Sequence, residues 1–144
     1  MKAIKIIIHP LTVIISFLFI LIIGEHVGGF YIKYILLALP HGSIHAVLAV
    51  GGIVLILFSH YKYRQQYADS IEPMLNISGV CMLAVSLLLF FTNDKQQYNI
   101  GTFDQTVPVL TIIIFGLLAT CFSLNSLITI TKRLFGTRHQ TGLK

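Results

Sequence analysis

Two histidines and a neighbouring Glu-His pair are the residues of this sequence that could do chemistry together. His41 and His45 are four residues apart, so both imidazoles would point the same way from a single helix. Glu25 and His26 lie in an earlier polar break, and a helical hairpin would bring all four side chains to one end of the fold. Imidazole and carboxylate groups bind zinc, copper or iron, and histidine also relays protons near neutral pH. The sequence therefore offers a candidate metal or haem site, or a proton relay, at Glu25, His26, His41 and His45.

The spacing of these four residues is a weak signal. The segment from His41 to His45 lacks the glutamate that a zinc protease helix carries between its two histidines. Histidines also occur where an apolar segment simply meets water. That interfacial position is the commoner explanation, and the metal site and the proton relay stay open beside it.

The composition indicates a membrane protein. Of the 144 residues, 56% are hydrophobic and 10% are charged, and the mean hydropathy is +0.86. A soluble domain carries about 25% charged residues. The net charge of +5 does not point to nucleic acid, because the basic residues lie at the ends of apolar runs. Cys81 and Cys121 each lie inside an apolar run, so no disulfide is expected.

The elements that must position these residues are apolar stretches long enough to cross a bilayer. The segment 40–63 has no polar face, which is typical of a helix in lipid or deep in a core. We predict an all-α integral membrane protein with one transmembrane domain over 1–131 and a basic cytoplasmic tail over 132–144. Residues 30–39 are too few to span, so they form an interfacial or re-entrant helix, or extend the next helix with a bend at Pro40. The predicted spans are 4–24, 41–60, 74–92 and 107–131.

The basic residues predict the orientation of the four spans. The N-terminus, the loop after the second span and the tail hold eight of the ten Lys and Arg residues, and only Lys33 and Lys95 fall on the other side. The positive-inside rule then places both termini in the cytoplasm, which requires an even number of spans. We expect an up-down bundle, with a bacterial inner membrane as its location. All six tyrosines fall at the predicted membrane interfaces.

Small residues predict where the helices pack, because close approach stabilises helix pairs in lipid. Asn125 is the strongest polar residue inside a span, and an amide there needs a partner. It could line a pore together with Thr120, or form an interhelical hydrogen bond to Ser86 or to a second copy of the chain. The small residues expected at helix contacts are Gly42, Ala46, Ala49, Gly52, Gly79 and Gly116.

The inventory of chemical groups favours a non-enzymatic protein. The central third of each predicted span lacks Asp, Glu, Lys and Arg, which usually mark transporters and pumps. The sequence contains no phosphate-binding loop and no nucleophile elbow. We therefore expect helix–helix association, either as an accessory subunit of a membrane complex or as a self-assembling pore such as an ion channel. Its partners would be the lipid bilayer and a second copy or another membrane protein. The alternatives are the metal- or haem-binding redox protein and a bundle that binds a small molecule or lipid.

Overall fold

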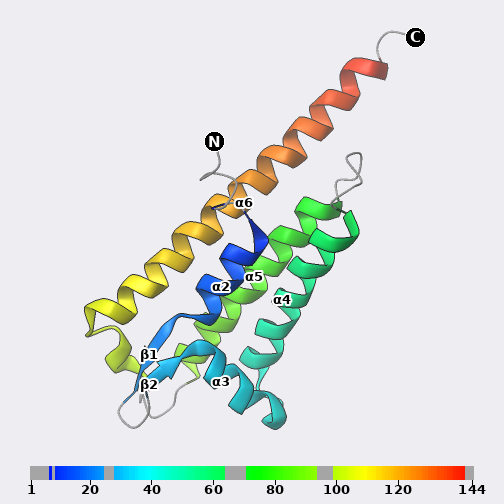
Figure 1. The fold of residues 1–144 in the computed structure, drawn as a ribbon. Helices are drawn as coiled ribbons and strands as arrows, with labels where there is room; N and C mark the ends of the chain where they lie inside the picture. The colour runs from blue at the N-terminus through cyan, green and yellow to red at the C-terminus, as the bar shows by residue number, and fades with distance from the viewer. Residues whose placement is uncertain (1–6, 8, 25–27, 64–70, 94–98, 142–144) are drawn as a thin grey trace.

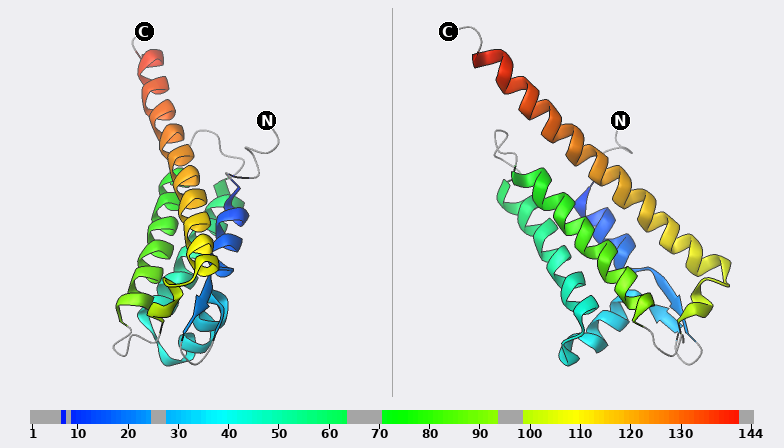
Figure 2. Two further views of the ribbon diagram at one scale, coloured as in Figure 1. Left: turned by 90° about the vertical axis from the view of Figure 1, so that its left-hand side faces the viewer. Right: turned by 180° about the vertical axis from the view of Figure 1, so that it is seen from behind.

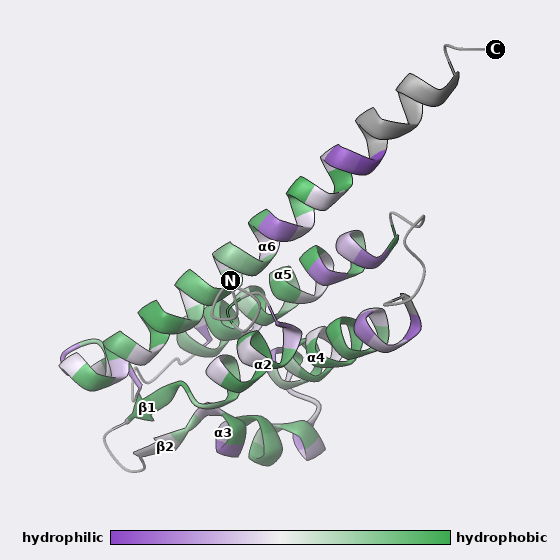
Figure 3. Cartoon of the chain, turned by 45° about the horizontal axis from the view of Figure 1, so that its top comes forward, coloured by the Kyte–Doolittle hydropathy of each residue, from purple (hydrophilic) through white to green (hydrophobic). Residues whose placement is uncertain are grey.

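Three long helices dominate the fold. The computed structural model describes residues 7, 9–24, 28–63, 71–93 and 99–141. Within them, α4 (Ile44–Tyr63), α5 (Ile71–Thr92) and α6 (Thr106–Thr141) are long and apolar enough to cross a membrane. Hydrophobic colour covers most of their length in Figure 3. The described residues thus contain three such helices, where four were predicted.

The helices α4 and α5 form an antiparallel pair (Figure 1), and their backbones approach closely at Gly52 and Gly79. A methyl carbon added to Gly52 would lie 2.8 Å from the carbonyl oxygen of Gly79. Ala46 and Ala49 are fully buried on the same helix. Glycine and alanine let two backbones approach where a larger side chain would separate them.

The first predicted span is not one helix. Helix α2 covers only Pro10–Leu18, and the chain continues as strand β1 (Leu21–Ile23), which pairs antiparallel with β2 (Gly28–Phe30) in the register Leu21↔Phe30. The prediction of a helix over 4–24 is therefore wrong after Leu18. Ile20, Ile22 and Ile23 are β-branched and favour extended backbone.

Threonines from the far end of the sequence bond to the backbone that leaves the helix. The hydroxyl of Thr111 accepts a hydrogen bond from the Leu21 amide at 3.0 Å. The hydroxyl of Thr102 accepts from the Ile23 amide at 3.1 Å and donates to the Ile23 carbonyl at 3.2 Å. Non-helical backbone is tolerated at membrane depth only where protein groups satisfy it in this way.

A short helix follows the hairpin. It is α3 (Tyr31–Ala38), and the 3₁₀ helix η1 (Leu39–His41) leads from it to Gly42. Gly42 has a φ of 67°, in the left-handed region that favours glycine, so the chain turns there before α4 begins. Residues 30–39 are thus a separate element and not an extension of the next helix.

Aromatic side chains join the elements into one core. The Phe17 ring lies 5.2 Å from Tyr31 and 5.3 Å from Phe115, and Tyr31 lies 5.1 Å from Phe90, between ring centroids. Helix α6 therefore packs against both α2 and α5, and α2 also contacts α4 (Figure 2). Beyond residue 131 the predicted tail continues α6, which projects past the other helices (Figure 1).

Two ends of the molecule are named from here on. The hairpin end carries β1, β2 and the short 3₁₀ helix η2 (Ile100–Thr102). The opposite end is called the charged end, because the Arg133 guanidinium lies 3.8 Å from the Glu72 carboxylate there. Ser59 also belongs to the charged end, since its hydroxyl donates to the Glu72 carbonyl at 2.9 Å.

Candidate functional site

The structure places His41 and His45 on different elements. His41 lies in η1, is exposed, and its Nδ1 is 3.0 Å from the Leu37 carbonyl oxygen. His45 lies in the first turn of α4, beyond the turn at Gly42. The assumption that both histidines share one helix face therefore does not hold.

The other two members of that cluster, Glu25 and His26, lie outside the described residues. Across the part of the chain that is described, no three His, Cys, Asp or Glu side chains come together as a metal site would require. The metal or haem site at Glu25, His26, His41 and His45 stays a prediction.

His45 lines a polar cavity of about 380 Å³ near the start of α4. Its Nε2 atom is buried without a hydrogen-bond partner, and its ring meets Phe90 edge to face with 5.4 Å between centroids. Polar side chains from three segments line the same cavity: Ser43, Asn93 and Asn99.

A buried hydrogen-bonded chain connects α3, α5 and α4. The Ser86 hydroxyl donates to the His45 carbonyl at 2.6 Å, so it must accept from the Tyr31 hydroxyl, 3.0 Å away. Burial raises the pKa of Tyr31 to about 12, and the hydrogen bond to Ser86 lowers it slightly. Tyr31 therefore stays a neutral phenol near pH 7 and holds α3 against α5.

Tyr31 was predicted, with the other tyrosines, at a membrane interface; the structure shows that its side chain is fully buried within the protein. Ser86 was one of the partners suggested for Asn125, and in the structure it bonds to Tyr31 and His45. No local pattern marks Tyr31, because its partners lie more than fifty residues further along the sequence.

His9 and His60 meet at the charged end. Their ring centroids are 5.2 Å apart with the planes inclined by 67°. His9 caps α2, since its Nδ1 accepts from the Leu11 amide at 3.3 Å.

The outward surface of α6 carries the predicted polar residues. Asn125 and Thr120 are exposed, and the Thr120 hydroxyl donates to the Gly116 carbonyl at 2.7 Å. The Asn125 side chain makes no hydrogen bond to any described residue. A carboxamide within an apolar helix is thus left facing outward.

A groove runs between α5 and α6. It encloses about 340 Å³, and an added methyl carbon at Gly116 would meet nothing within 4 Å. Small side chains dominate its walls. The groove is lined by Val80 and Ala84 of α5 and by Phe115, Gly116, Ala119, Thr120, Ser123, Leu124 and Leu127 of α6.

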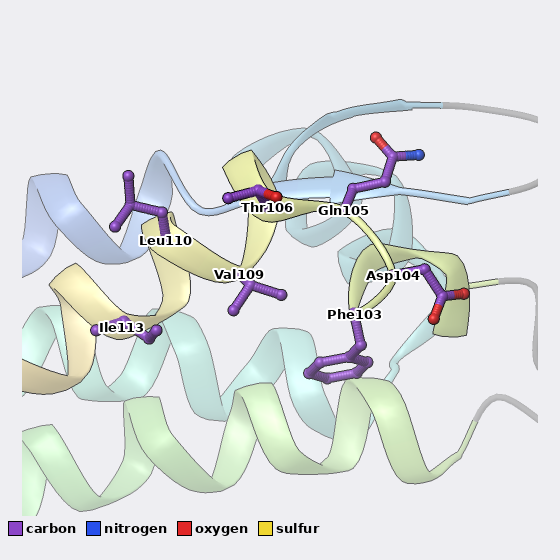
Figure 4. A pocket seen from close by; sticks show the side chains of 7 residues that line it. All are labelled: Phe103, Asp104, Gln105, Thr106, Val109, Leu110 and Ile113. Carbon is purple, nitrogen blue, oxygen red and sulfur yellow. The ribbon is translucent and has the colours of Figure 1, made fainter.

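A second hollow of about 340 Å³ lies at the start of α6 (Figure 4). Asp104, Gln105 and Thr106 form its polar edge, and Val109, Leu110 and Ile113 continue it along the apolar helix, with Phe103 beside them. It is an open surface hollow at the hairpin end. Its acidic edge and apolar wall give it no arrangement of nucleophile and base.

No protein-family model, curated protein or solved structure matches this chain. Two features of α6 could contact a partner: the α5–α6 groove and, on another side of the helix, the outward-facing amide of Asn125.

Proposed function

We propose that this is a non-enzymatic integral membrane protein that works as a subunit of a helical assembly, with another transmembrane helix packed in the α5–α6 groove. The observation that carries the proposal is the groove itself, with an open position at Gly116 and walls of small side chains. Helices in lipid associate by close packing, since burial against another helix gains little over burial against acyl chains. A groove of small residues is the surface that such packing uses.

The sparse burial of α6 supports the same proposal. Within Thr106–Arg133, only 22% of an apolar 18-residue stretch is buried inside the protein. Large apolar side chains on that helix remain exposed, including Leu110, Leu117 and Leu127. Lipid can cover such side chains, but the small residues of the groove beside them suit the close packing of another helix.

A fourth membrane crossing made of α2 and β1 would complete the topology. His9 lies beside His60 at the charged end, and Thr102 holds Ile23 at the hairpin end. The nine residues of α2 rise about 14 Å, and residues 20–23 after it add about 13 Å. Together they come close to the roughly 30 Å of a bilayer core.

With that crossing, His9 and the C-terminal part of α6 lie on the same side of the membrane. Lys62, Lys132 and Arg133 belong to the charged end, and the positive-inside rule then orients this end toward the cytoplasm. Cysteine-reactive labelling from each side of sealed vesicles, with single cysteines at Lys132 and at Phe103, tests this orientation.

Site-specific photo-cross-linking in membranes tests the groove. A photo-reactive side chain in place of Thr120 should form an adduct with a polypeptide, because Thr120 lines the groove. The same side chain in place of Ser78, which is exposed on α5 but does not line the groove, is the control. Gly116→Leu fills the groove and should abolish the Thr120 adduct.

Three results would count against this function. The first is that Thr120 gives adducts with lipid alone. The second is that Thr120 and Ser78 give the same adducts in the same yield. The third is that Gly116→Leu leaves the adduct intact while the protein remains folded.

A further inference from the structure

We infer that α6 carries a second contact surface, centred on Asn125, at which two copies of this chain pair about a two-fold axis. This surface lies away from the α5–α6 groove. Gly116 and Asn125 are nine residues apart, which places them on opposite sides of the helix, roughly 180° apart. The inference therefore goes beyond the groove and whatever occupies it.

The depth of Asn125 makes its unpaired amide costly. Arg133 marks the charged end through its ion pair with Glu72, and Asn125 lies about two turns, or roughly 12 Å, further into the apolar stretch. No charged residue occurs between Asn125 and Thr131. Lipid offers no hydrogen bonds, so an amide at this depth requires a protein partner.

The amide of Asn125 lacks that partner within the described part of the chain. The hydrogen bond at this position runs from the Thr129 hydroxyl to the Asn125 backbone carbonyl, at 2.9 Å, and leaves the side chain unused. Ser86, one of the two partners suggested from sequence, is already bonded to Tyr31 and His45. The partner must therefore come from another molecule.

A second copy of the chain supplies the matching group. A carboxamide has both a donor and an acceptor, so two asparagines facing each other satisfy one another. Copies inserted with the same orientation carry Asn125 at the same depth, and a two-fold axis along the membrane normal brings the residue opposite itself. A single buried asparagine fixes pairing and register in this way in parallel helix pairs.

The surroundings of Asn125 form a seam suited to such pairing. Exposed residues recur on this side of α6 at intervals of three and four, the spacing of a left-handed helix pair. Ile114 is 44% exposed, Leu117 63% and Ile128 51%. The seam consists of Ile114, Leu117, Cys121, Asn125 and Ile128.

Cys121 is an intrinsic reporter for this seam. It is an exposed free cysteine one turn from Asn125, and Cys81→Ser leaves it as the single cysteine of the chain. In membranes, oxidation with copper phenanthroline should convert Cys81→Ser protein into a reducible dimer of twice the mass. The matched control is Cys81→Ser/Cys121→Ser/Thr120→Cys, whose cysteine faces the groove and should yield far less dimer.

The role of the amide is tested with labelled protein in lipid vesicles. Energy transfer between two labelled copies, measured across protein-to-lipid ratios, gives the dimer dissociation constant. Asn125→Leu should raise that constant about 3- to 30-fold, the range for an interhelical hydrogen bond in lipid. Asn125→Gln keeps a self-complementary amide and should lose less affinity.

The proposal is overturned if Cys121 forms no dimer, if Cys121 and the Thr120→Cys control react equally, or if Cys121 is captured only by a different protein. It also fails if Asn125→Leu leaves the dissociation constant unchanged. The photo-adduct from Thr120 should persist in Asn125→Leu protein. Failure at the seam is thereby distinguished from failure at the groove.

Discussion

The close approach of α4 and α5 predicts a graded response to adding one methyl group at each of four glycines. Gly52→Ala would place a Cβ 2.8 Å from the Gly79 carbonyl oxygen and 2.9 Å from Leu83 Cδ2. Gly79→Ala would place one 2.5 Å from Ile56 Cγ1 and 3.0 Å from the Gly52 carbonyl oxygen. A backbone oxygen cannot move aside, so in both variants the helices must separate.

Two opposing effects determine how much each Gly→Ala substitution changes the free energy of unfolding. Alanine is a better helix former than glycine by about 1 kcal/mol, and this gain applies to every one of the variants. Overpacking a tight contact costs about 1–3 kcal/mol. Gly116→Ala meets nothing within 4 Å, so it retains the gain without the cost. The difference in unfolding free energy between Gly116→Ala and Gly52→Ala therefore isolates the clash, at about 1–3 kcal/mol.

Gly51→Ala provides an intermediate case. Its Cβ would lie 2.6 Å from Cε of Met82, the end of a flexible side chain that can rotate away. We expect Gly51→Ala to lie between Gly116→Ala and Gly52→Ala in stability. The four variants thus form a series in which only the neighbour of the new methyl group changes.

Pulse proteolysis of purified protein across an SDS titration measures the series. The sequence contains no tryptophan, so proteolysis is preferable to intrinsic fluorescence. Equal unfolding free energies for Gly52→Ala and Gly116→Ala would refute the close helix contact. A Gly51→Ala variant less stable than Gly52→Ala would refute the distinction between a rigid carbonyl and a flexible methionine.

Two further predictions use the same assay. Thr102→Val leaves the amide and carbonyl of Ile23 unpaired, so it should lower the unfolding free energy by about 2 kcal/mol or more. The control Thr131→Val, at an exposed hydroxyl bonded within α6, should cost clearly less, and an equal cost would contradict the role of Thr102. Because the Tyr31 pKa is raised from 10.0 to about 12, its neutral form stabilises the fold below pH 10, and that stability is lost as the pH rises toward 12. Tyr31→Phe should be less sensitive to a change from pH 9 to pH 11.5 than the unmodified protein, and an identical pH dependence would show that Tyr31 is not buried.

The long helices could be predicted because their signal is local. Residues 41–60, 74–92 and 107–131 were predicted as spans, and α4, α5 and α6 lie at those places with ends that differ by a few residues, apart from the extension of α6 to Thr141. A long helix that is apolar on every side must be surrounded by lipid or by the core of a protein. Hydropathy therefore identifies such helices from the sequence alone.

The first segment could not be predicted from hydropathy because hydropathy carries no information about backbone hydrogen bonds. Residues 4–24 are as apolar as a spanning helix, yet the chain leaves the helix after Leu18. The groups that permit this, Thr102 and Thr111, lie some eighty to ninety residues later in the sequence. Only the folded chain brings them to Leu21 and Ile23.

The candidate site also combines features that are visible locally in the sequence with features that depend on the folded chain. Asn125 was identified because an amide inside an apolar run is visible locally, but its outward position depends on which face of α6 packs on α2 and α5. The pairing of His41 with His45 was inferred from helical spacing. It does not hold because Gly42 adopts a left-handed conformation, which the sequence permits but does not require.

Helix α6 separates the residues that hold the fold from those proposed for assembly. Thr111 bonds to β1, and Phe115, Ala119 and Phe122 are buried on the inward side. Gly116 and Asn125 lie on two different outward flanks of the same helix. Substitution at either flank removes no described hydrogen bond of a buried side chain, so a change in association there can be assigned to the flank. The Asn125 amide bonds to no described residue of its own chain, and in the proposed pairing a second copy would offset the energetic cost of that amide in lipid.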